Sequence, residues 1–501
     1  METPASIAAG LRRAADFVER SNATADGDAI HKIVGSNGVV HVRPGAGLLG
    51  DRPLDADLLW DFGDPGGRRN QLPGFNAAHR YSEPGEYTVT LVLRHAGSVS
   101  IHRSTVRVPS VDRSRTITQP APKLGDGVRL ELTRGNVYDI DETIVLGGHD
   151  IRITAVGTGP PPILRWVGGS GEMIRCTPTC RDVLIEGIAF DAVGKRGDRF
   201  LIANAIAASG TNLAIIDCRF DQVQDAINAN GRPTGLLIQR CTAGDDLHAY
   251  LCWAEGTDIV LLDNTATHSI KEHIVRVGGA ERLLGVGNAF TNRRKSCFNV
   301  QVAEQVWLED NRISGAWALG PLGGADGRDS TERCRIAVVR SNVSDTTFEL
   351  KHGAESVRFS GNLLHTDNQP AICIEGFSAA FDRGVTDIDL YDNTAVNLGE
   401  HGNFLRIDGP AKNVRLTGNR YLAPRLRPGS HETAVIFILD DNADAIVGMT
   451  DNHWPDTRDR NHAFAGDGLH YVWPTWSDQR GYVRDLTNPS AGSAQTPPAS
   501  A

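Results

Sequence analysis

The chain has 501 residues, of which 22% are charged, 40% are apolar and only 6% are aromatic, and its formal net charge is −10. This is more chain than one ordinary hydrophobic core uses, which excludes a small disulfide-stapled module and indicates two or three folded units. The 54 glycines and 24 prolines are spread along the chain, a usage that favours a mostly-β protein with many turns. Acidic and basic residues are interleaved, so the sequence predicts neither a nucleic-acid partner nor binding to anionic lipid.

The two ends of the chain carry no predicted chemistry. The sequence contains no apolar run long enough for a membrane span, and its start lacks the apolar core of a signal peptide. Residues 1–34 instead have the pattern of a short amphipathic helix and a linker, and residues 488–501 have the composition of disorder. The eight cysteines are predicted to be buried free thiols, because most of them are spread through apolar segments.

A first folded unit is predicted at residues 35–110 from period-two alternation and closely spaced turn signals. Within it, WDFGD at residues 60–64 is followed by HRYSEPGEYTVTL at residues 79–91. These two motifs resemble the hallmark of the PKD domain, an immunoglobulin-like β-sandwich. In the physical interpretation, Trp60 and Phe62 fill the core of the sandwich, so the motif is predicted to be structural rather than catalytic.

The second unit is a series of repeats. A short apolar phrase, such as Leu236-Leu-Ile-Gln-Arg-Cys or Val306-Trp-Leu-Glu-Asp-Asn, recurs about every 23 residues and ends on cysteine or asparagine. The interval grows mainly by insertion, which indicates one coil per repeat, with each coil burying its face on the next. The closing residues are Cys218, Cys241, Asn264, Asn288, Asn311, Asn342, Asn362, Asn393, Asn419 and Asn452.

This pattern resembles the right-handed parallel β-helix of the pectin-lyase-like superfamily, in which asparagines stack as a ladder at one turn. The predicted fold class is therefore all-β, a small PKD-like β-sandwich followed by a right-handed parallel β-helix at residues 120–455, with a cap at residues 456–487. The ladder is expected to satisfy buried backbone groups at a sharp bend. Because each coil contacts its neighbours, deletion of residues 1–110 is expected to leave a folded β-helix. The resemblance also suggests an extracellular or cell-surface protein.

Chemistry in such a fold is organised in columns, because one sheet position recurs in neighbouring coils about 4.8 Å along the axis. The aligned second apolar runs predict one outward column, made of Asn228, Trp253, Arg276, Gln301, Lys351, Glu375 and Arg406 and flanked by Asn299, Glu349 and Asp408. Amides, one tryptophan and mixed charges suit a sugar chain. The predicted substrate-binding residues are Trp253, Asn299, Gln301, Glu349, Glu375, Arg406 and Asp408. The alternative is a solvated face with paired charges.

A second column is predicted in the preceding turn, where His248, Lys271 and Lys295 align on successive coils. This arrangement favours β-elimination on a uronate polymer, in which cations neutralise the carboxylate and a base removes the C5 proton. Lys271 or His248 is the predicted base, and Arg276 and Lys351 are the predicted carboxylate clamps. Many members of the superfamily are polysaccharide lyases, so the resemblance implies the same activity.

Two other functions stay open at the level of the sequence. Gly244-Asp245-Asp246 resembles the paired aspartates of the polygalacturonase family, which allows a hydrolase, although that family's other motifs are missing. A non-catalytic glycan-binding or structural surface protein is equally compatible with the fold. Calcium is compatible with the hard oxygen donors Asp225, Asp245 and Asp246, but no repeated calcium-loop pattern accompanies them, so no metal or cofactor is assigned. The expected partner is a polysaccharide, and the sequence does not predict the oligomeric state.

Overall fold

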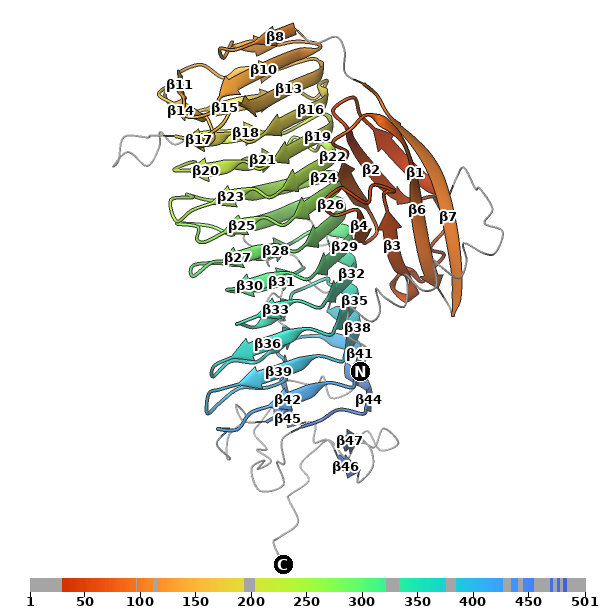
Figure 1. Cartoon of the computed structure of the whole chain (residues 1–501). Helices are drawn as coiled ribbons and strands as arrows, with labels where there is room; N and C mark the ends of the chain where they lie inside the picture. The colour runs from red at the N-terminus through yellow and green to blue at the C-terminus, as the bar shows by residue number, and fades with distance from the viewer. Residues whose placement is uncertain are drawn as a thin grey trace, which may run out of the picture. The chain divides into compact units, whose positions relative to one another are not determined.

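The chain folds almost entirely into strands, as the computed structural model in Figure 1 shows. The structure describes residues 29–95, 97–110, 115–192, 203–320, 333–374, 384–426, 434–439, 445–454, 469–471, 475–477 and 481–483. The expected N-terminal helix, the tail and most of the expected cap lie outside these residues. The chain divides into a first unit, Met1–Lys295 with Gln305–Trp307, and a second unit, Ser296–Glu304 with Leu308–Ala501.

The first unit begins with a two-sheet sandwich. One antiparallel sheet contains β1 (Ile30–Val34), β2 (Val39–Pro44) and β5 (Ala77–Arg80), and the other contains β4 (Gln71–Pro73), β3 (Asp57–Asp61), β6 (Gly85–His95) and β7 (Ser98–Val108), with one 3-10 turn at Pro53–Asp55. Trp60 and Phe62 are completely buried, which confirms their predicted structural role. The indole N–H of Trp60 donates to Gly74 O at 2.9 Å. Strand β1 lies within the segment that was expected to be a linker.

The remainder of the first unit is a stack of coils, each of which contributes one strand to each of three parallel ribbons. The long ribbon contains β8 (Arg115–Ile117), β10 (Val128–Thr133), β13 (His149–Val156), β16 (Arg181–Glu186), β19 (Thr211–Ile216) and β22 (Thr234–Gln239). The short ribbon contains β9 (Lys123–Leu124), β12 (Ile144–Leu146), β15 (Glu172–Cys176), β18 (Asn204–Ala207) and β21 (Ile227–Ala229). Strands β24 (Cys252–Leu262) and β26 (Val275–Val286) run through both ribbons. The third ribbon contains β11 (Val137–Ile140), β14 (Ile163–Trp166), β17 (Ala189–Asp191), β20 (Arg219–Asp221), β23 (Thr242–Ala243), β25 (Thr265–Ala266) and β27 (Ala289–Thr291).

The second unit repeats this coil. Its long ribbon contains β32 (Cys334–Arg340), β35 (Glu355–Ser360), β38 (Val385–Tyr391), β41 (Ala411–Thr417) and β44 (Ile446–Thr450), and β29 (Ala303–Glu309) has residues in both units. Its short ribbon contains β28 (Phe298–Val300), β31 (Trp317–Leu319), β34 (Phe348–Leu350), β37 (Ile372–Ile374), β40 (Leu405–Ile407) and β43 (Ile436–Leu439). Its third ribbon contains β30 (Arg312–Ser314), β33 (Val343–Ser344), β36 (Leu363–Thr366), β39 (Thr394–Asn397) and β42 (Arg420–Leu422). After these coils, β45 (Leu469–Tyr471) pairs with β43, and β46 (Thr475–Ser477) pairs with β47 (Gly481–Val483).

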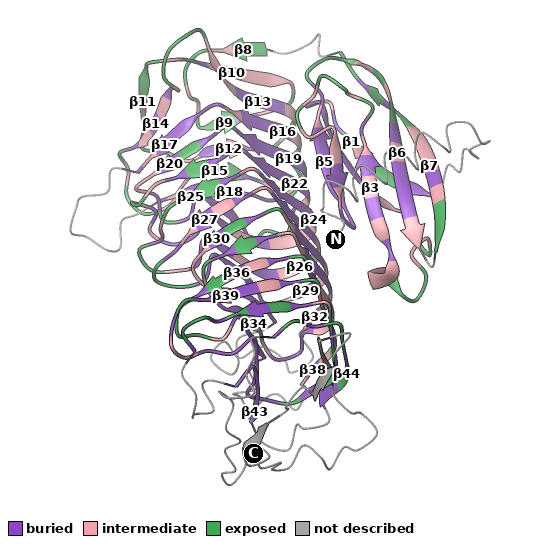
Figure 2. Ribbon diagram, turned by 60° about the horizontal axis from the view of Figure 1, so that its bottom comes forward, coloured by how far each residue is buried: buried purple, intermediate pink, exposed green. Residues whose placement is uncertain are grey.

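Period-two alternation builds the interior of each unit. Residues that point into the coils are buried and drawn in purple in Figure 2, while their neighbours along the strand point outward. The parallel pairing of successive coils confirms the predicted all-β class, a small sandwich followed by a parallel β-helix. All eight cysteines fall among the described residues, and each is a buried free thiol, as predicted. No helix in the described part of the chain is long and apolar enough to cross a membrane.

The asparagine ladder is present within each unit. The side-chain oxygen of Asn264 accepts from Cys241 N at 2.9 Å, and its amide nitrogen donates to Ile238 O at 3.0 Å. In the second unit the same bonds link Asn311, Asn342, Asn362, Asn393, Asn419 and Asn452. Each ladder residue follows a corner residue with positive φ, such as Asp263 at 55° or Asp392 at 54°. Short polar residues and glycine tolerate this conformation best, which explains the recurring Asp-Asn and Gly-Asn pairs.

Asn393→Leu is expected to lower the free energy of unfolding by about 3–5 kcal/mol, because several buried polar groups would lose their partners at once. The side chain of Asn393 is completely buried, and its amide donates to Phe359 O and to Asn419 Oδ1, both at 2.9 Å. Urea denaturation measures the change. The same substitution at the exposed Asn230 should alter stability by less than about 0.5 kcal/mol. Equal effects at the two positions would contradict the ladder assignment.

An apolar column lies on the outward side of the long ribbon in the first unit. In-register strands place Leu184, Ala214, Leu237, Val260 and Leu284 in this column. Each of these outward side chains is at most 1% exposed, because the sandwich covers them. A Cβ at Gly74 would lie 2.8 Å from Leu284 Cδ1, and Phe75 packs edge-on against Trp307 with ring centroids 5.3 Å apart. The sandwich and these coils therefore share one apolar contact.

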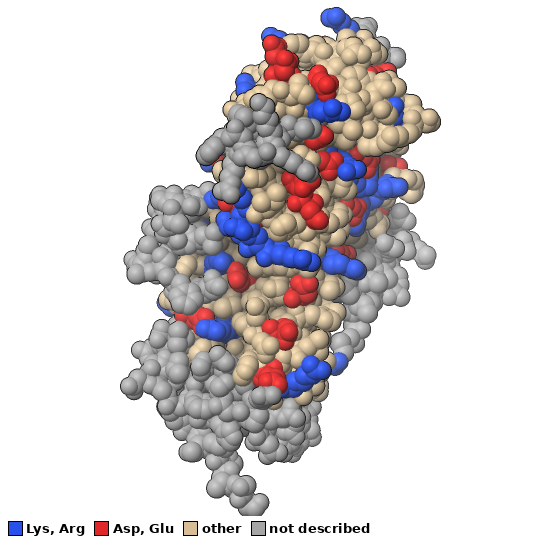
Figure 3. All heavy atoms as spheres, turned by 90° about the vertical axis from the view of Figure 1, so that its left-hand side faces the viewer, with Lys and Arg blue, Asp and Glu red and all other residues tan. Residues whose placement is uncertain are grey.

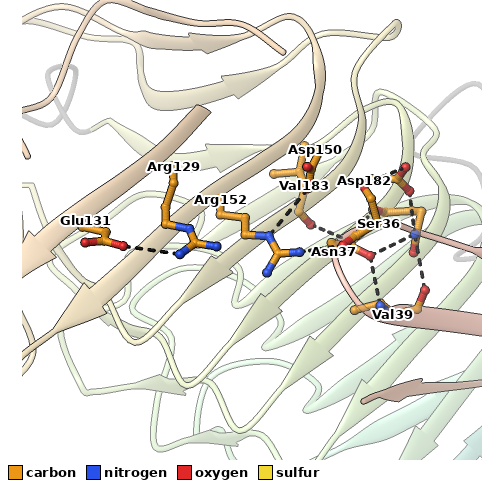
Figure 4. Close-up of polar contacts among 10 residues, drawn as sticks. Ser36, Asn37, Val39, Arg129, Glu131, Asp150, Arg152, Asp182 and Val183 are labelled. Carbon is orange, nitrogen blue, oxygen red and sulfur yellow. Dashed lines mark hydrogen bonds and ion pairs between the residues drawn. The ribbon is translucent and has the colours of Figure 1, made fainter. Parts of the chain in front are cut away.

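Polar contacts surround this apolar column. Figure 4 shows Asn37 entering the long ribbon, where its amide nitrogen donates to Val183 O at 3.2 Å and to Asn212 O at 3.0 Å. Beside it, Arg152 Nη2 donates to Ser36 O at 2.6 Å. Further along the column, ion pairs join Arg69 to Asp263 and Arg43 to Asp258. The expectation that a folded β-helix remains after deletion of residues 1–110 was based on contacts between coils alone. The contact with the sandwich was not part of that argument.

Candidate functional site

The outward column predicted for the short ribbon is present in the first unit. Strands β21, β24 and β26 place Asn228, Trp253 and Arg276 in register. The preceding residues on these strands, Ile227, Cys252 and Val275, are completely buried and point into the coil. The three residues of the predicted column, of which Trp253 and Arg276 are predicted site residues, therefore point outward. Arg276 Cζ lies 5.1 Å from the centroid of the Trp253 ring, a cation–π contact that holds the guanidinium over the indole.

A second row of side chains lies three residues earlier in each coil. It contains Asp225, Tyr250 and His273, which are 3%, 6% and 7% exposed. Ala226 N donates to Tyr250 O at 2.8 Å, which aligns the coil of Asp225 with the coil of Tyr250. The pairing of β24 with β26 extends this alignment to His273. Polar side chains therefore stack on successive coils in a largely buried position.

Direct contacts join the two rows. Asn228 Nδ2 donates to Asp225 Oδ2 at 2.9 Å, and Arg276 Nη1 donates to Tyr250 Oη at 3.4 Å. The rings of Tyr250 and Trp253 lie 5.5 Å apart. We call Asp225, Asn228, Tyr250, Trp253 and Arg276 the Tyr250 cluster. It combines a carboxyl, an amide, a phenol, an indole and a guanidinium on three adjacent coils.

Burial sets the protonation of this cluster. It raises the pKa of Asp225 to about 6, and the hydrogen bond from Asn228 offsets only part of that shift. Burial also raises the pKa of Tyr250, against the lowering effect of Arg276. The carboxylate of Glu272, which pairs with Lys295 Nζ at 2.6 Å, raises both pKa values further. Asp225 thus exchanges its proton near neutral pH, while Tyr250 keeps its phenolic proton.

His248 and Lys271, the two candidate bases, lie on adjacent coils as predicted. Lys271 N donates to His248 O at 3.0 Å, and the side chain of Lys271 is exposed. Each of these residues lies two positions before a member of the buried row, Tyr250 or His273. The candidate bases and the Tyr250 cluster therefore belong to the same pair of coils.

The second unit has a different register from the one expected. Its short ribbon places Asn299, Ala318, Glu349, Cys373, Arg406 and Phe437 in one row. Arg406 therefore aligns with Glu349, whereas Lys351 lies two residues further along its strand. Gln301 is likewise two residues beyond Asn299, and Glu375 lies outside the described residues. The predicted outward side chains still point outward, because a shift of two residues along a strand keeps a side chain on the same face.

Four of the predicted site residues in the second unit form two ion pairs, each between residues two positions apart in the sequence. Lys351 Nζ lies 2.9 Å from Glu349 Oε2, and Arg406 Nε lies 2.7 Å from Asp408 Oδ1. The guanidinium of Arg406 also covers the ring of Phe437 at 5.4 Å. These charges are paired with one another, as expected for the alternative of a solvated face with paired charges. The Tyr250 cluster fits that alternative less well.

Charges of both signs are interspersed over the surface shown in Figure 3. Among the described residues, no group of three or more His, Cys, Asp or Glu side chains is arranged to hold a metal ion. Asp245 and Asp246 are exposed at a turn, whereas Asp225 belongs to the Tyr250 cluster. The three aspartates considered for calcium are therefore in different environments.

Tyr250 is the residue of the cluster that sequence reasoning missed. It lies outside the strands, so an alignment of the strands does not assign it to a column of outward side chains. Its position between the predicted site residues His248 and Trp253 was an available signal. A large aromatic polar residue between two outward site residues is a candidate to reach the same face.

The family model of the PKD domain matches residues 41–108. The sandwich is a PKD domain. Among the curated proteins compared, none matches the chain. Three solved chains match it, and one is the A-module of mannuronan C-5 epimerase AlgE6 from Azotobacter vinelandii, with 9% identity, a TM-score of 0.30 and coverage of 66% of this chain and 88% of that chain. A similarity at this level carries no argument about the activity of the present protein.

Proposed function

We propose that the protein is a carbohydrate-active enzyme that cleaves a uronate-containing polysaccharide by β-elimination at the Tyr250 cluster. The observation that carries this proposal is the position of Arg276, which contacts Trp253 and Tyr250 on the neighbouring coil. The buried carboxyl of Asp225 lies one coil further, in the same row as Tyr250. Arg276 as a fixed cation and Tyr250 as a proton donor are two of the groups that this reaction requires, and Trp253 offers an aromatic surface for a sugar ring. The solvated-face alternative does not account for the buried Oδ1 atom of Asp225, which has no hydrogen-bond partner in the part of the chain that the structure describes.

In this proposal Arg276 and Asp225 act on the uronate carboxylate. The guanidinium neutralises its charge, and protonated Asp225 donates a hydrogen bond to it, which makes the C5 proton more acidic. Arg276 is half-buried and held over Trp253, so its position is fixed before the substrate binds. Asn228 orients Asp225 through its amide.

The proton transfers are assigned to the same coils. Lys271 or His248, unprotonated, removes the C5 proton, and the electron pair forms the C4–C5 double bond while the C4–O bond breaks. Tyr250 keeps its proton because burial raises its pKa, so it can protonate the leaving oxygen. Arg276 then stabilises the phenolate that remains until a proton returns from solvent.

The second unit supplies further sugar-binding side chains in this proposal. Asn299, Gln301, Glu349, Lys351, Glu375, Arg406 and Asp408 were predicted to face the sugar chain, and Lys351 acts there as a clamp for a second carboxylate. Its ion pair with Glu349 fixes the direction of its ammonium group. A clamp that does not act on the reacting atoms contributes to binding more than to the chemical step.

Lys351→Ala is therefore expected to raise KM by about tenfold and to leave kcat within about twofold, because a cation that only binds sugar acts equally on the substrate and the transition state. Steady-state kinetics on the polysaccharide substrate measures both constants. Lys412→Ala, a change of an exposed lysine on β41, is the matched control and should change neither constant. A fall in kcat with an unchanged KM would place Lys351 at the reacting centre instead.

The test of the proposed function is a screen of the purified chain against uronate and neutral polysaccharides. Absorbance of a new C4–C5 double bond and the release of reducing ends are measured on the same samples. Unsaturated product supports the lyase. Reducing ends without unsaturation would overturn it in favour of a hydrolase, and binding without any product would favour a glycan-binding protein.

A further inference from the structure

A fully enclosed histidine lies in the contact between the PKD domain and the long ribbon. His41 is on β2, where alternation turns it away from the sandwich core, and it is only 1% exposed. Its ring lies against Gly235 at the start of β22, where a Cβ would be 3.1 Å from His41 Cδ2 and 3.3 Å from Nε2. The backbone of the β-helix therefore approaches the imidazole closely, and only glycine allows this approach.

His41 differs from the other polar side chains of this contact. The amides of Asn37 and Asn76 donate to backbone carbonyls of the β-helix, at 3.0 Å to Asn212 O and at 3.2 Å to Ile259 O. Both ring nitrogens of His41 are buried and have no hydrogen-bond partner among the described residues. A neutral ring tolerates such a position, whereas an imidazolium would bury a charge and two N–H groups that have no acceptor.

The charged groups around His41 are already paired with one another. Asp258 of β24 is the carboxylate whose charge raises the pKa of His41, against the larger lowering effect of burial. Its side chain is 3% exposed. It is bonded to Arg282 of β26 and lies 3.5 Å from Arg43 of β2. Two arginines therefore compensate Asp258 before any proton reaches His41.

Among the described residues, the other elements around His41 bring no unpaired carboxylate to it. Glu281 of β26 pairs with Arg282 at 2.7 Å, and on β5 the residue opposite His41 is Ala78. On β1, His31 is exposed and lies beside the same ion pair of Arg43 and Asp258. A proton on His41 would therefore add a positive charge to a contact that already holds two arginines.

We propose that the attachment of the PKD domain to the β-helix is a pH-sensitive contact, and that protonation of His41 opens it in mildly acidic solution. This inference concerns how the chain holds itself together and is independent of the proposed reaction. When the contact opens, the imidazole becomes solvated and accepts a proton, and the apolar column of the long ribbon loses its cover.

The pKa of His41 gives the sign and the size of the effect. Burial lowers this pKa to about 4, whereas a solvated histidine titrates near 6.5. The open form therefore binds the proton more readily, so the contact is fully stable above about pH 6.5 and weakens as the pH falls toward 4. The equilibrium between the attached and open forms should shift by about 30-fold at pH 5.

The test uses the full chain with the dye 1-anilinonaphthalene-8-sulfonate, which fluoresces on exposed apolar surface. Wild-type protein should bind more dye at pH 5 than at pH 7.5, because Leu237, Val260 and Leu284 become accessible. His41→Phe keeps a flat ring that cannot be protonated, so the increase should disappear. His31→Phe, the matched control on β1, should keep the wild-type increase. An unchanged acid response in His41→Phe would overturn the proposal.

A second variant covers the case in which His41→Phe does not fold. Gly235→Ala places a Cβ against the His41 ring at a position with φ +76°, so the contact should open without acid. This variant should bind dye at pH 7.5 as strongly as the wild type does at pH 5. Dye binding that stays at the wild-type level at pH 7.5 would contradict the assigned contact and with it the proposal.

Discussion

Arg276→Ala is expected to lower turnover by at least about a hundredfold on the polysaccharide that the screen identifies, because it removes the cation that stabilises the developing negative charge. The guanidinium also donates to Tyr250 Oη, so the variant leaves the phenolate without a stabilising partner. The effect should fall on kcat and on kcat/KM alike, as for an interaction that forms in the transition state. Initial rates of double-bond formation measure it.

Two further variants separate chemistry from stability. Arg276→Lys keeps the charge but loses the planar contact with Trp253, so it should recover part of the activity. Arg294→Ala, a change of an exposed arginine that also belongs to the first unit, should leave the rates unchanged. Melting temperatures of all three variants should match the wild type within a few degrees. Full activity of Arg276→Ala would show that the reaction takes place elsewhere.

Leu237→Arg should give the second large effect, a loss of about 4 kcal/mol or more in the free energy of unfolding of the first unit, because an unpaired charge would enter a dry contact. Leu237 points outward from β22, and the PKD domain buries it completely. The variant should also bind the apolar dye at neutral pH. Chemical denaturation gives the energy, and dye fluorescence shows whether the column is uncovered.

The matched control for Leu237→Arg is Leu398→Arg, because Leu398 is 52% exposed. That change should cost less than about 0.5 kcal/mol. Deletion of residues 1–110 should reproduce the dye binding of Leu237→Arg, because it removes the cover of the column. Whether the product still contains a folded β-helix, as the repeat pattern predicts, is measured by its circular dichroism, and a product that binds no dye would contradict the cover.

The fold followed from the sequence because its signal is repeated. The ladder residue and the positive-φ corner before it recur from Cys218 to Asn452, so a single error of alignment changes little. The attachment of the PKD domain also had a signal. Leu236-Leu237-Ile238 has three consecutive apolar residues, which is typical of a strand buried on both faces, whereas Val357-Arg358-Phe359 alternates. The first pattern indicates a cover over the ribbon, but it does not say which part of the chain supplies it.

The candidate site was only partly predictable, for two physical reasons. In the first unit the coils have nearly equal length, so Trp253 and Arg276 were aligned correctly. In the second unit the short strands are separated by segments of unequal length, and the row of Arg406 was displaced by two residues. Tyr250 reaches the site from outside a strand, and its raised pKa depends on burial, which no spacing rule reports.

The corners of the coil give this architecture unusual freedom to change in length. Successive ladder residues are 20 residues apart at one coil and 33 apart at another, yet both pairs form the same hydrogen bonds. The hydrogen bonds between neighbouring corners therefore do not depend on the number of residues that separate them. A protein of this kind can change the length of one coil by a single insertion or deletion event, while the ladder on either side of that coil stays in place.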